Sequence, residues 1–391
     1  MSRKSLKLSY HGSPHHYQQQ QNQQDDKQQQ LIPGLPDHIS HLILSKISPT
    51  ILYSVSHPWR NFIYSPIYPP FYSIYTILTP DNLTHSSSSK PQQILTPICL
   101  SSFDPISSQW ESLPPPPPPL SLLLRHPPFI SRDLPVQSVA VGDKLAVVAG
   151  TTQHLAPALP KPLVFDPSTR VWTYGPSISV PRRWCATGSL NGSLYIASGF
   201  GSHFSTDTAR SVEKWNPSAN NRVQQWEKLG PLWDGRFSRE ATDAIGWKGR
   251  LCMVNVKGDA TKQGAVYDSK NNTWQEMEEG MVAGWRGPAA SMAEEVIYMV
   301  DESKGVLKIY NEEKDEWVNI MESEKLRGAQ QMTAHGGKLC VLCNGGNVII
   351  VVDVTAPPPR MWVVEPPQGF NVVAVHILPR TSRGPLGLNI V

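Results

Sequence analysis

The chain has 391 residues, of which 39% are hydrophobic and 17% charged, and its formal net charge is +3. This length and hydrophobic content suffice for one large core and a smaller module. A charge so close to neutral gives no support to a general role in binding nucleic acid or membranes. The five cysteines are scattered and odd in number, which suits a reducing compartment better than a disulfide framework. The sequence has neither a signal-peptide pattern nor a long apolar run, so we expect a soluble protein of the cytoplasm, the nucleus or both.

Residues 1–30 are polar, with nine glutamines between Gln18 and Gln30. Such a segment cannot bury enough apolar area to offset the entropy of ordering it. We therefore predict a disordered, Gln-rich N-terminal tail. The alternative is that the glutamine tract mediates association.

A small helical module is predicted for residues 31–68. Pro36 and Asp37 suit the start of a helix, and Pro49 is expected to end it. Apolar side chains recur at helical spacing before Pro49 and continue after it: Ile39, Leu42, Ile43 and Ile47, then Ile51, Leu52, Val55, Trp59, Phe62 and Ile63. So short a segment cannot hide this many large apolar side chains. The module is therefore expected to dock on another surface.

From Phe71 onward the hydrophobic periodicity changes to two, which is typical of short strands. Six tryptophans recur in this region at spacings of 62, 54, 48, 43 and 45 residues: Trp110, Trp172, Trp226, Trp274, Trp317 and Trp362. Four of them close the same phrase, an aromatic residue followed by Asp or Asn and, six residues later, by Trp. The phrase begins at Phe103, Phe165, Tyr267 and Tyr310, and two stretched copies begin at Trp215 and Val352. A repeat of about 50 residues indicates stacked units that cannot bury their apolar faces alone.

We predict that residues 71–379 form a six-bladed β-propeller in which each blade is a four-stranded antiparallel sheet. The fold class is thus mainly β, with a small α-helical module before the propeller and a C-terminal tail at 380–391. The first unit lacks one strand, and the segment from Asn371 to Leu378 is expected to complete its blade and close the ring. Ring closure of this kind removes exposed sheet edges.

The repeats resemble kelch repeats, and the stretches LPDHI and VSHPWR of the helical module resemble an F-box. Their order resembles the plant F-box/kelch-repeat family. The resemblance implies a substrate-recognition subunit of an SCF-type (Skp–cullin–F-box) E3 ubiquitin ligase. It implies that the F-box docks on a Skp-family adaptor and, through it, a cullin-RING ligase, while the propeller binds the protein to be ubiquitinated. The adaptor contacts would be Leu35, Pro36, Ile39, Leu42 and Trp59.

A non-ligase kelch scaffold or protein-interaction module with a degenerate F-box is the alternative. An enzyme with a cofactor in the propeller channel is a third hypothesis, which the motifs do not favour. Cys340 and Cys343 have the spacing of half a metal site, but residues three apart in a strand point to opposite faces. We expect no catalytic residues, no metal and no cofactor, and neither nucleic acid nor membrane as a partner.

Four arginines stand at comparable places in successive repeats: Arg182, Arg239, Arg286 and Arg327. The kelch resemblance implies that they lie near one mouth of the central channel. One interpretation is a basic pocket for an acidic or phosphorylated protein segment, because Arg forms bidentate bonds to such groups. The other is that these arginines brace loops through internal hydrogen bonds.

Pro114 begins a run of six prolines. The run is interpreted as a stiff loop between blades. Its alternative role is that of a polyproline ligand for another domain.

Overall fold

The computed structural model describes residues 30–81, 95–117, 120–123, 136–152, 154–219, 224–238, 244–255 and 263–380. The N-terminal tail, except for its last residue, and the C-terminal tail from residue 381 lie outside the described residues. The described chain divides into two compact units, residues 30–69 and residues 70–380. In the described part of the chain, none of the helices is long and apolar enough to cross a membrane.

The first unit consists of three short helices, α1 (Asp37–Leu44), α2 (Pro49–Val55) and α3 (His57–Ile63). The expectation that Pro49 ends the first helix is wrong, because α1 ends at Leu44 and Pro49 lies in the first turn of α2. Pro58 likewise lies in the first turn of α3. The first turn of a helix tolerates proline because its N–H groups have no partner within the helix.

A small core joins the three helices. Leu44, Leu52, Phe62 and Ile63 are buried, one or two from each helix. The ring of Tyr68 packs edge-on against Phe62 with centroids 5.5 Å apart. The Tyr68 hydroxyl donates a hydrogen bond of 2.6 Å to a backbone carbonyl between α1 and α2. These contacts hold the helices in one arrangement and leave the unit with few buried side chains.

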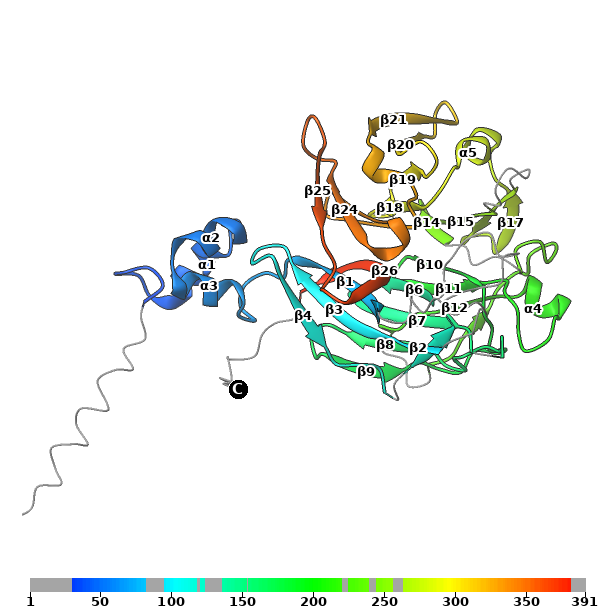
Figure 1. Cartoon of the computed structure of the whole chain (residues 1–391), viewed down its shortest axis with the longest axis horizontal. Coiled ribbons are helices and arrows are strands. Elements are labelled where there is room, and N and C mark those ends of the chain that lie inside the picture. Colours follow the sequence, from blue (N-terminus) through cyan, green and yellow to red (C-terminus); the bar gives the residue numbers. More distant parts are fainter. Residues whose placement is uncertain are drawn as a thin grey trace, which may run out of the picture. The chain divides into compact units, whose positions relative to one another are not determined.

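The described part of the second unit contains six four-stranded antiparallel sheets, which are the blades of a β-propeller (Figure 1). In each blade the strands are given from first to fourth. Blade 1 is β26 (Phe370–Pro379), β1 (Tyr72–Pro80), β3 (Cys99–Asp104) and β4 (Gln109–Leu113); blade 2 is β6 (Val136–Val141), β7 (Lys144–Gly150), β8 (Leu163–Asp166) and β9 (Val171–Tyr174); blade 3 is β10 (Ala186–Leu190), β11 (Ser193–Ala197), β12 (Val212–Trp215) and β13 (Glu227–Lys228). Blade 4 is β14 (Ala244–Trp247), β15 (Arg250–Asn255), β16 (Gln263–Asp268) and β17 (Thr273–Glu276); blade 5 is β18 (Ala289–Met292), β19 (Val296–Asp301), β20 (Val306–Asn311) and β21 (Glu316–Glu322); blade 6 is β22 (Gln331–His335), β23 (Lys338–Cys343), β24 (Val348–Asp353) and β25 (Arg360–Val364). The other elements are the paired strands β2 (Leu95–Pro97) and β5 (Ser121–Leu123), the helices α4 (Thr206–Arg210) and α5 (Glu279–Gly284), and the 3-10 helices η2 (Glu324–Leu326) and η3 (Asn344–Gly346). The predicted six-bladed, mainly β fold is confirmed.

The predicted closure of the ring is also confirmed. β26, from the C-terminal end of the propeller, pairs antiparallel with β1 along its whole length and becomes the first strand of that blade. The first strands contact one another in the cyclic order β26, β6, β10, β14, β18, β22 and again β26, and so surround the axis. The hydroxyl of Tyr75 donates to the carbonyl of Pro379 at 2.8 Å, which adds a side-chain bond to the pairing.

The recurring tryptophans join neighbouring blades. Five indole N–H groups donate to a backbone carbonyl of the preceding blade or the loop that follows it, at 2.8–3.0 Å: Trp110 to Glu365, Trp172 to Pro114, Trp226 to Pro176, Trp274 to Gly230 and Trp317 to Met281. In the same five blades the Trp ring packs on the aromatic residue that opens the phrase, with centroids 5.2–5.7 Å apart. One side chain per repeat thus fills the space between blades and satisfies a backbone acceptor.

The acidic or amide residue of the phrase closes the turn between the third and fourth strands. Asp166 Oδ1, for example, accepts the N–H of Ser168 at 2.9 Å, and Asp268 Oδ1 accepts that of Lys270 at 2.8 Å. Asp and Asn suit this role because their short side chains accept hydrogen bonds from the backbone two residues on. The spacing between this residue and Trp therefore reflects one tight turn.

The proline run contributes to the same packing between blades. The carbonyl of Pro114 accepts the indole N–H of Trp172, and that of Pro117 accepts the hydroxyl of Tyr174. The part of the run that the structure describes therefore forms a loop with backbone hydrogen bonds to the next blade, as the loop interpretation expects, while Pro114, Pro115 and Pro117 stay exposed.

Candidate functional site

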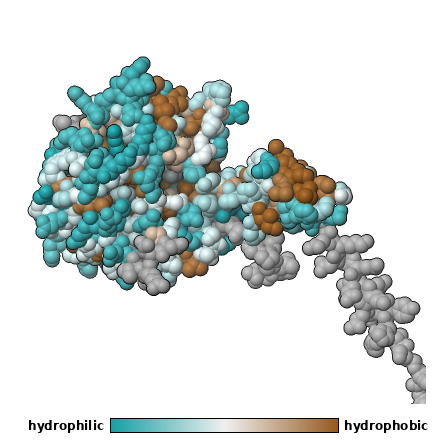
Figure 2. All heavy atoms as spheres, turned by 180° about the vertical axis from the view of Figure 1, so that it is seen from behind, coloured by the Kyte–Doolittle hydropathy of each residue, from teal (hydrophilic) through white to brown (hydrophobic). Residues whose placement is uncertain are grey.

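The helical unit has an uncovered apolar face. Four large aliphatic side chains on α1 and α2 are 44–63% exposed: Leu42, Ile43, Ile51 and Val55. Figure 2 shows hydrophobic atoms gathered over one side of this unit. Soluble proteins rarely expose such a cluster unless it binds something. We call these four residues the apolar face.

The five predicted adaptor contacts have different surroundings. Leu42 lies on the apolar face, Pro36 is exposed just before α1, and Leu35 and Ile39 are half-buried. Trp59 is half-buried, and its indole N–H donates to the carbonyl of Leu31 at 2.6 Å. Trp59 therefore holds the segment that enters α1, in addition to any contact with a partner.

Three residues of the apolar face are absent from the adaptor contacts predicted from the sequence: Ile43, Ile51 and Val55. The sequence did contain a pattern that indicates a shared face, since Ile51 and Val55 are four residues apart and therefore lie on one side of a helix. The helices have only seven or eight residues, so apolar side chains occur on all their sides and spacing alone does not separate core from face.

The predicted propeller arginines precede first strands of successive blades. Arg182 lies before β10, Arg286 before β18 and Arg327 before β22. Since neighbouring strands are antiparallel, all three lie at the face of the ring where the first strands begin. Arg239 lies outside the described residues.

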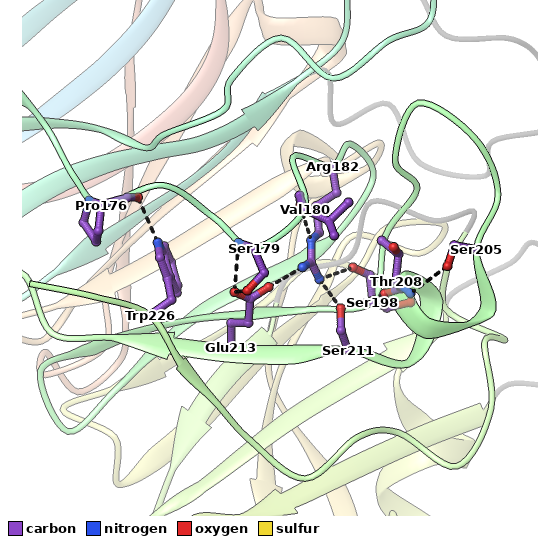
Figure 3. A network of polar contacts seen from close by, with 10 residues as sticks. All are labelled: Pro176, Ser179, Val180, Arg182, Ser198, Ser205, Thr208, Ser211, Glu213 and Trp226. Carbon is purple, nitrogen blue, oxygen red and sulfur yellow. Dashed lines mark hydrogen bonds and ion pairs between the residues drawn. The ribbon is translucent and has the colours of Figure 1, made fainter.

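Arg182 is 1% exposed, and its guanidinium is fully engaged inside the protein (Figure 3). It forms a buried ion pair with Glu213 and donates to the carbonyls of Val180 and Ser198, both at 3.1 Å. It also donates to the hydroxyl of Ser211 at 2.6 Å. This geometry corresponds to the bracing role that the sequence left open as the second interpretation.

Arg286 and Arg327 are exposed. Arg327 forms an ion pair of 3.0 Å with Glu324, three residues earlier in the chain. A contact of either arginine with a substrate stays a prediction. The three described arginines do not line the channel cavity described next.

The first strands enclose a channel cavity of about 250 Å³. Its walls carry small residues and a few polar groups, among them Ser138, Thr187, Gln331 and His376. Burial lowers the pKa of His376 to about 3, so the ring is neutral at pH 7. Its Nε2 lies 2.9 Å from the hydroxyl of Ser138 on the next blade. Ser138 and His376 thus bind each other across two blades.

Four of the five cysteines have a thiol that burial makes less acidic. Burial raises the pKa of the Cys185, Cys252 and Cys340 thiols to about 12, which disfavours the nucleophilic thiolate. Cys340 and Cys343 pack into different hydrophobic clusters, as expected for residues three apart in a strand. In the described ranges, no group of three or more His, Cys, Asp or Glu residues is arranged to hold a metal ion.

A folded helical unit with an uncovered apolar face, joined in one chain to a six-bladed propeller, defines a protein-interaction molecule with two separate binding elements. F-box/kelch-repeat protein SKIP25 of Arabidopsis thaliana is 47% identical to this chain over 364 residues, which cover 90% of each protein. F-box/kelch-repeat protein SKIP4 of the same plant is 24% identical over 337 residues, or 82% of each protein. No protein-family profile matches the chain. The chain belongs to the F-box/kelch-repeat family, as the extent of the first similarity shows, and the resemblance inferred from its motifs is confirmed.

Proposed function

We propose that this protein is the non-catalytic substrate-recognition subunit of an SCF-type E3 ubiquitin ligase. The apolar face of the helical unit is the observation that carries the proposal. An F-box in such a ligase must expose apolar side chains to a Skp-family adaptor, and this unit exposes four of them on α1 and α2.

The size of the apolar face fits such an interface. Burial of one exposed Leu or Ile side chain contributes about 1.5–3 kcal/mol. A few such residues at the centre of an interface dominate its binding energy. Leu42 and Ile51, which are 63% and 57% exposed, have the most surface to lose on docking.

The propeller is proposed to hold the protein that becomes ubiquitinated. Its closed ring is a rigid platform, and the loops before and between its strands vary in length and chemistry. A bound protein would be held near the ubiquitin-carrying enzyme, so that this subunit supplies proximity and selectivity while other subunits perform the reaction. The raised thiol pKa values are consistent with the absence of a ubiquitin thioester on this chain.

Co-purification of the full chain with a Skp-family adaptor tests the proposal. The informative variant is Leu42→Ser with Ile51→Ser, because both side chains are exposed and their removal leaves the core of the helical unit intact. Val171→Ser with Val318→Ser is the matched control, since these valines are 51% and 41% exposed on the propeller. Trp59→Ala is less informative because it also releases Leu31.

We expect wild type and control to retain the adaptor and the Leu42/Ile51 variant to lose it by at least about tenfold in affinity. If the wild-type chain does not bind the adaptor, the ligase proposal fails and the scaffold alternative is favoured. If all three proteins bind equally, the apolar face is not the docking surface.

A further inference from the structure

Three loops of the propeller meet around Trp184. They are residues 154–156 between β7 and β8, 180–185 between β9 and β10, and 198–204 between β11 and β12. Leu155 and Phe200 pack against the buried Trp184 ring, so each loop contributes one side chain to this cluster. All three loops lie at the face of the ring where the first strands begin, since they enter a first strand or follow a second one.

Arg183 is held at the centre of this cluster. Its backbone N–H and carbonyl both pair with Phe200, at 2.9 and 2.8 Å. Its guanidinium carbon lies 4.3 Å from the centroid of the Trp184 ring and 5.0 Å from that of Phe200. Two aromatic rings thus contact the guanidinium and fix its position.

The donors of this guanidinium are not used. Nε and Nη1 of Arg183 are buried and have no hydrogen-bond partner among the described residues, and the residue is 5% exposed. The preceding residue, Arg182, is as deeply buried but donates to four acceptors. Burial lowers the pKa of Arg183, because its charge has lost water without gaining an acceptor.

A buried charge whose hydrogen-bond donors have no acceptor is costly, and a ligand that supplies an acceptor removes part of that cost. Unlike Nε and Nη1, the third guanidinium nitrogen of Arg183, Nη2, is not one of the buried nitrogens that lack a hydrogen-bond partner. This atom forms a two-donor edge of the guanidinium with Nε and another with Nη1. Since Nε and Nη1 are inaccessible to solvent, an acceptor with two oxygens contacts Nη2 first and gains the second donor when the side chains around the guanidinium shift.

The rim of the cluster carries two exposed apolar side chains. Phe204 is 54% exposed, and its ring centroid is 5.9 Å from that of Phe200. Val180 is 40% exposed and lies against Gly201, in the same loop as Phe200 and Phe204. The loop that packs Phe200 on the guanidinium of Arg183 thus also contacts two uncovered apolar side chains, Phe204 and Val180.

We propose that this cluster binds an acidic segment of a protein, with an Asp or Glu carboxylate on the Arg183 guanidinium and an adjacent apolar side chain against Phe204 and Val180. The inference rests on the proposed function, in which the propeller holds a protein substrate, and it specifies where and by what chemistry. A carboxylate matches the site better than a phosphate dianion, because one guanidinium offers one positive charge and one two-donor edge at a time.

A selection of random twelve-residue peptides on the immobilised full chain tests the site. We expect enrichment of sequences with Asp or Glu next to a large apolar residue. Arg183→Met should weaken binding of the enriched peptide by at least about tenfold. Arg360→Met, which removes an exposed arginine at the start of β25 that belongs to no predicted binding site, is the matched control and should bind like wild type.

Substitutions in the enriched peptide identify the anion. Replacement of its acidic residue by Asn or Gln should abolish binding, and replacement by phosphoserine should weaken it. Stronger binding of the phosphoserine peptide would overturn the carboxylate assignment. No acidic enrichment on the wild-type chain, or equal binding by Arg183→Met, would overturn the site itself.

Thermal unfolding separates this role from a purely structural one. If Arg183 serves a ligand, Arg183→Met should leave Tm within about 2 °C of wild type or raise it. Arg182→Met, at the neighbouring position, should lower Tm by about 5 °C or more. A comparable fall in both variants would show that Arg183 is a structural residue. The Skp adaptor takes no part in these assays, so loss of the peptide site and loss of the ligase role are distinguishable.

Discussion

Arg182 and Glu213 form an ion pair in which both side chains are only 1% exposed. Glu213 also accepts the N–H and the hydroxyl of Ser179, at 3.2 and 2.6 Å. The pair thereby ties the loop before β10 to β12 of the same blade (Figure 3). The position of the neighbouring Arg183 depends on this loop.

We expect Arg182→Met to lower the free energy of unfolding by about 3–5 kcal/mol, because it leaves the Glu213 carboxylate buried without its counter-charge. The double variant Arg182→Met, Glu213→Leu should recover a large part of this loss, since no buried charge remains. Urea denaturation of the three proteins measures both effects. A loss below about 0.5 kcal/mol in the single variant would contradict the assigned bracing role.

The indole hydrogen bonds predict unequal effects of one substitution at two repeats. Trp274→Phe keeps a ring against Tyr267 but removes the donor to the carbonyl of Gly230, so we expect a loss of about 1–2 kcal/mol. Trp362 is 41% exposed, and its indole N–H meets no acceptor among the described residues. Trp362→Phe should therefore change the stability by less than about 0.5 kcal/mol in the same urea experiment. Equal losses would show that the hydrogen bond contributes little.

The sequence predicted the blades well because each blade contains a fixed number of residues between an Asp or Asn and a Trp, and local hydrogen bonds explain this spacing. A carboxylate or amide closes a tight turn, and the Trp that follows reaches a backbone carbonyl, which any sequence supplies. The exception, Trp362, follows Val352 where other repeats have an aromatic residue, and it is the most exposed of the six. Here the weakened phrase in the sequence corresponds to a weakened contact in the structure.

The binding residues were harder to predict because they depend on which way individual side chains turn. Arg182 and Arg183 are consecutive, and both are basic and buried. Only the loop conformation, with Trp184 at a φ of 52°, decides that one meets Glu213 and the other two aromatic rings. Similarly, Pro49 fits the end of one helix or the start of the next. The length of the loop after Leu44, which tertiary packing sets, distinguishes the two.

The closure of the ring by β26 predicts that loss of a contact to β26 destabilises this strand locally. Gln331 Oε1 accepts the N–H of Val375 in β26 at 2.8 Å, and Gln331→Met removes this acceptor and leaves a buried N–H unpaired. We expect a loss of about 1–3 kcal/mol and faster hydrogen exchange in β26. Trp274→Phe is the control, because it removes the hydrogen bond to the carbonyl of Gly230, which joins two blades that do not include β26. Faster exchange of β26 in both variants would mean that the effect is not specific to the closure.

The buried His376 predicts that acid destabilises the propeller well above the range in which carboxylates titrate. Its pKa is about 3 in the folded protein, below the value of about 6.5 for a histidine in the unfolded chain. Between these values the unfolded state binds the proton and the folded state does not. The contribution of His376 to stability is therefore full above pH 6.5 and decreases as the pH falls toward 3.

The largest slope from this one group is about 1.4 kcal/mol per pH unit. Urea denaturation at pH 7, 6, 5 and 4 should show this decrease in the wild-type protein and a flatter profile in His376→Gln. Ser138→Ala is the control, because it removes the hydroxyl 2.9 Å from Nε2 but leaves the ring buried, so the slope should remain. Parallel profiles for wild type and His376→Gln would show that His376 accepts a proton without unfolding, for example through an opening of the seam between β26 and β6 that exposes the ring to water.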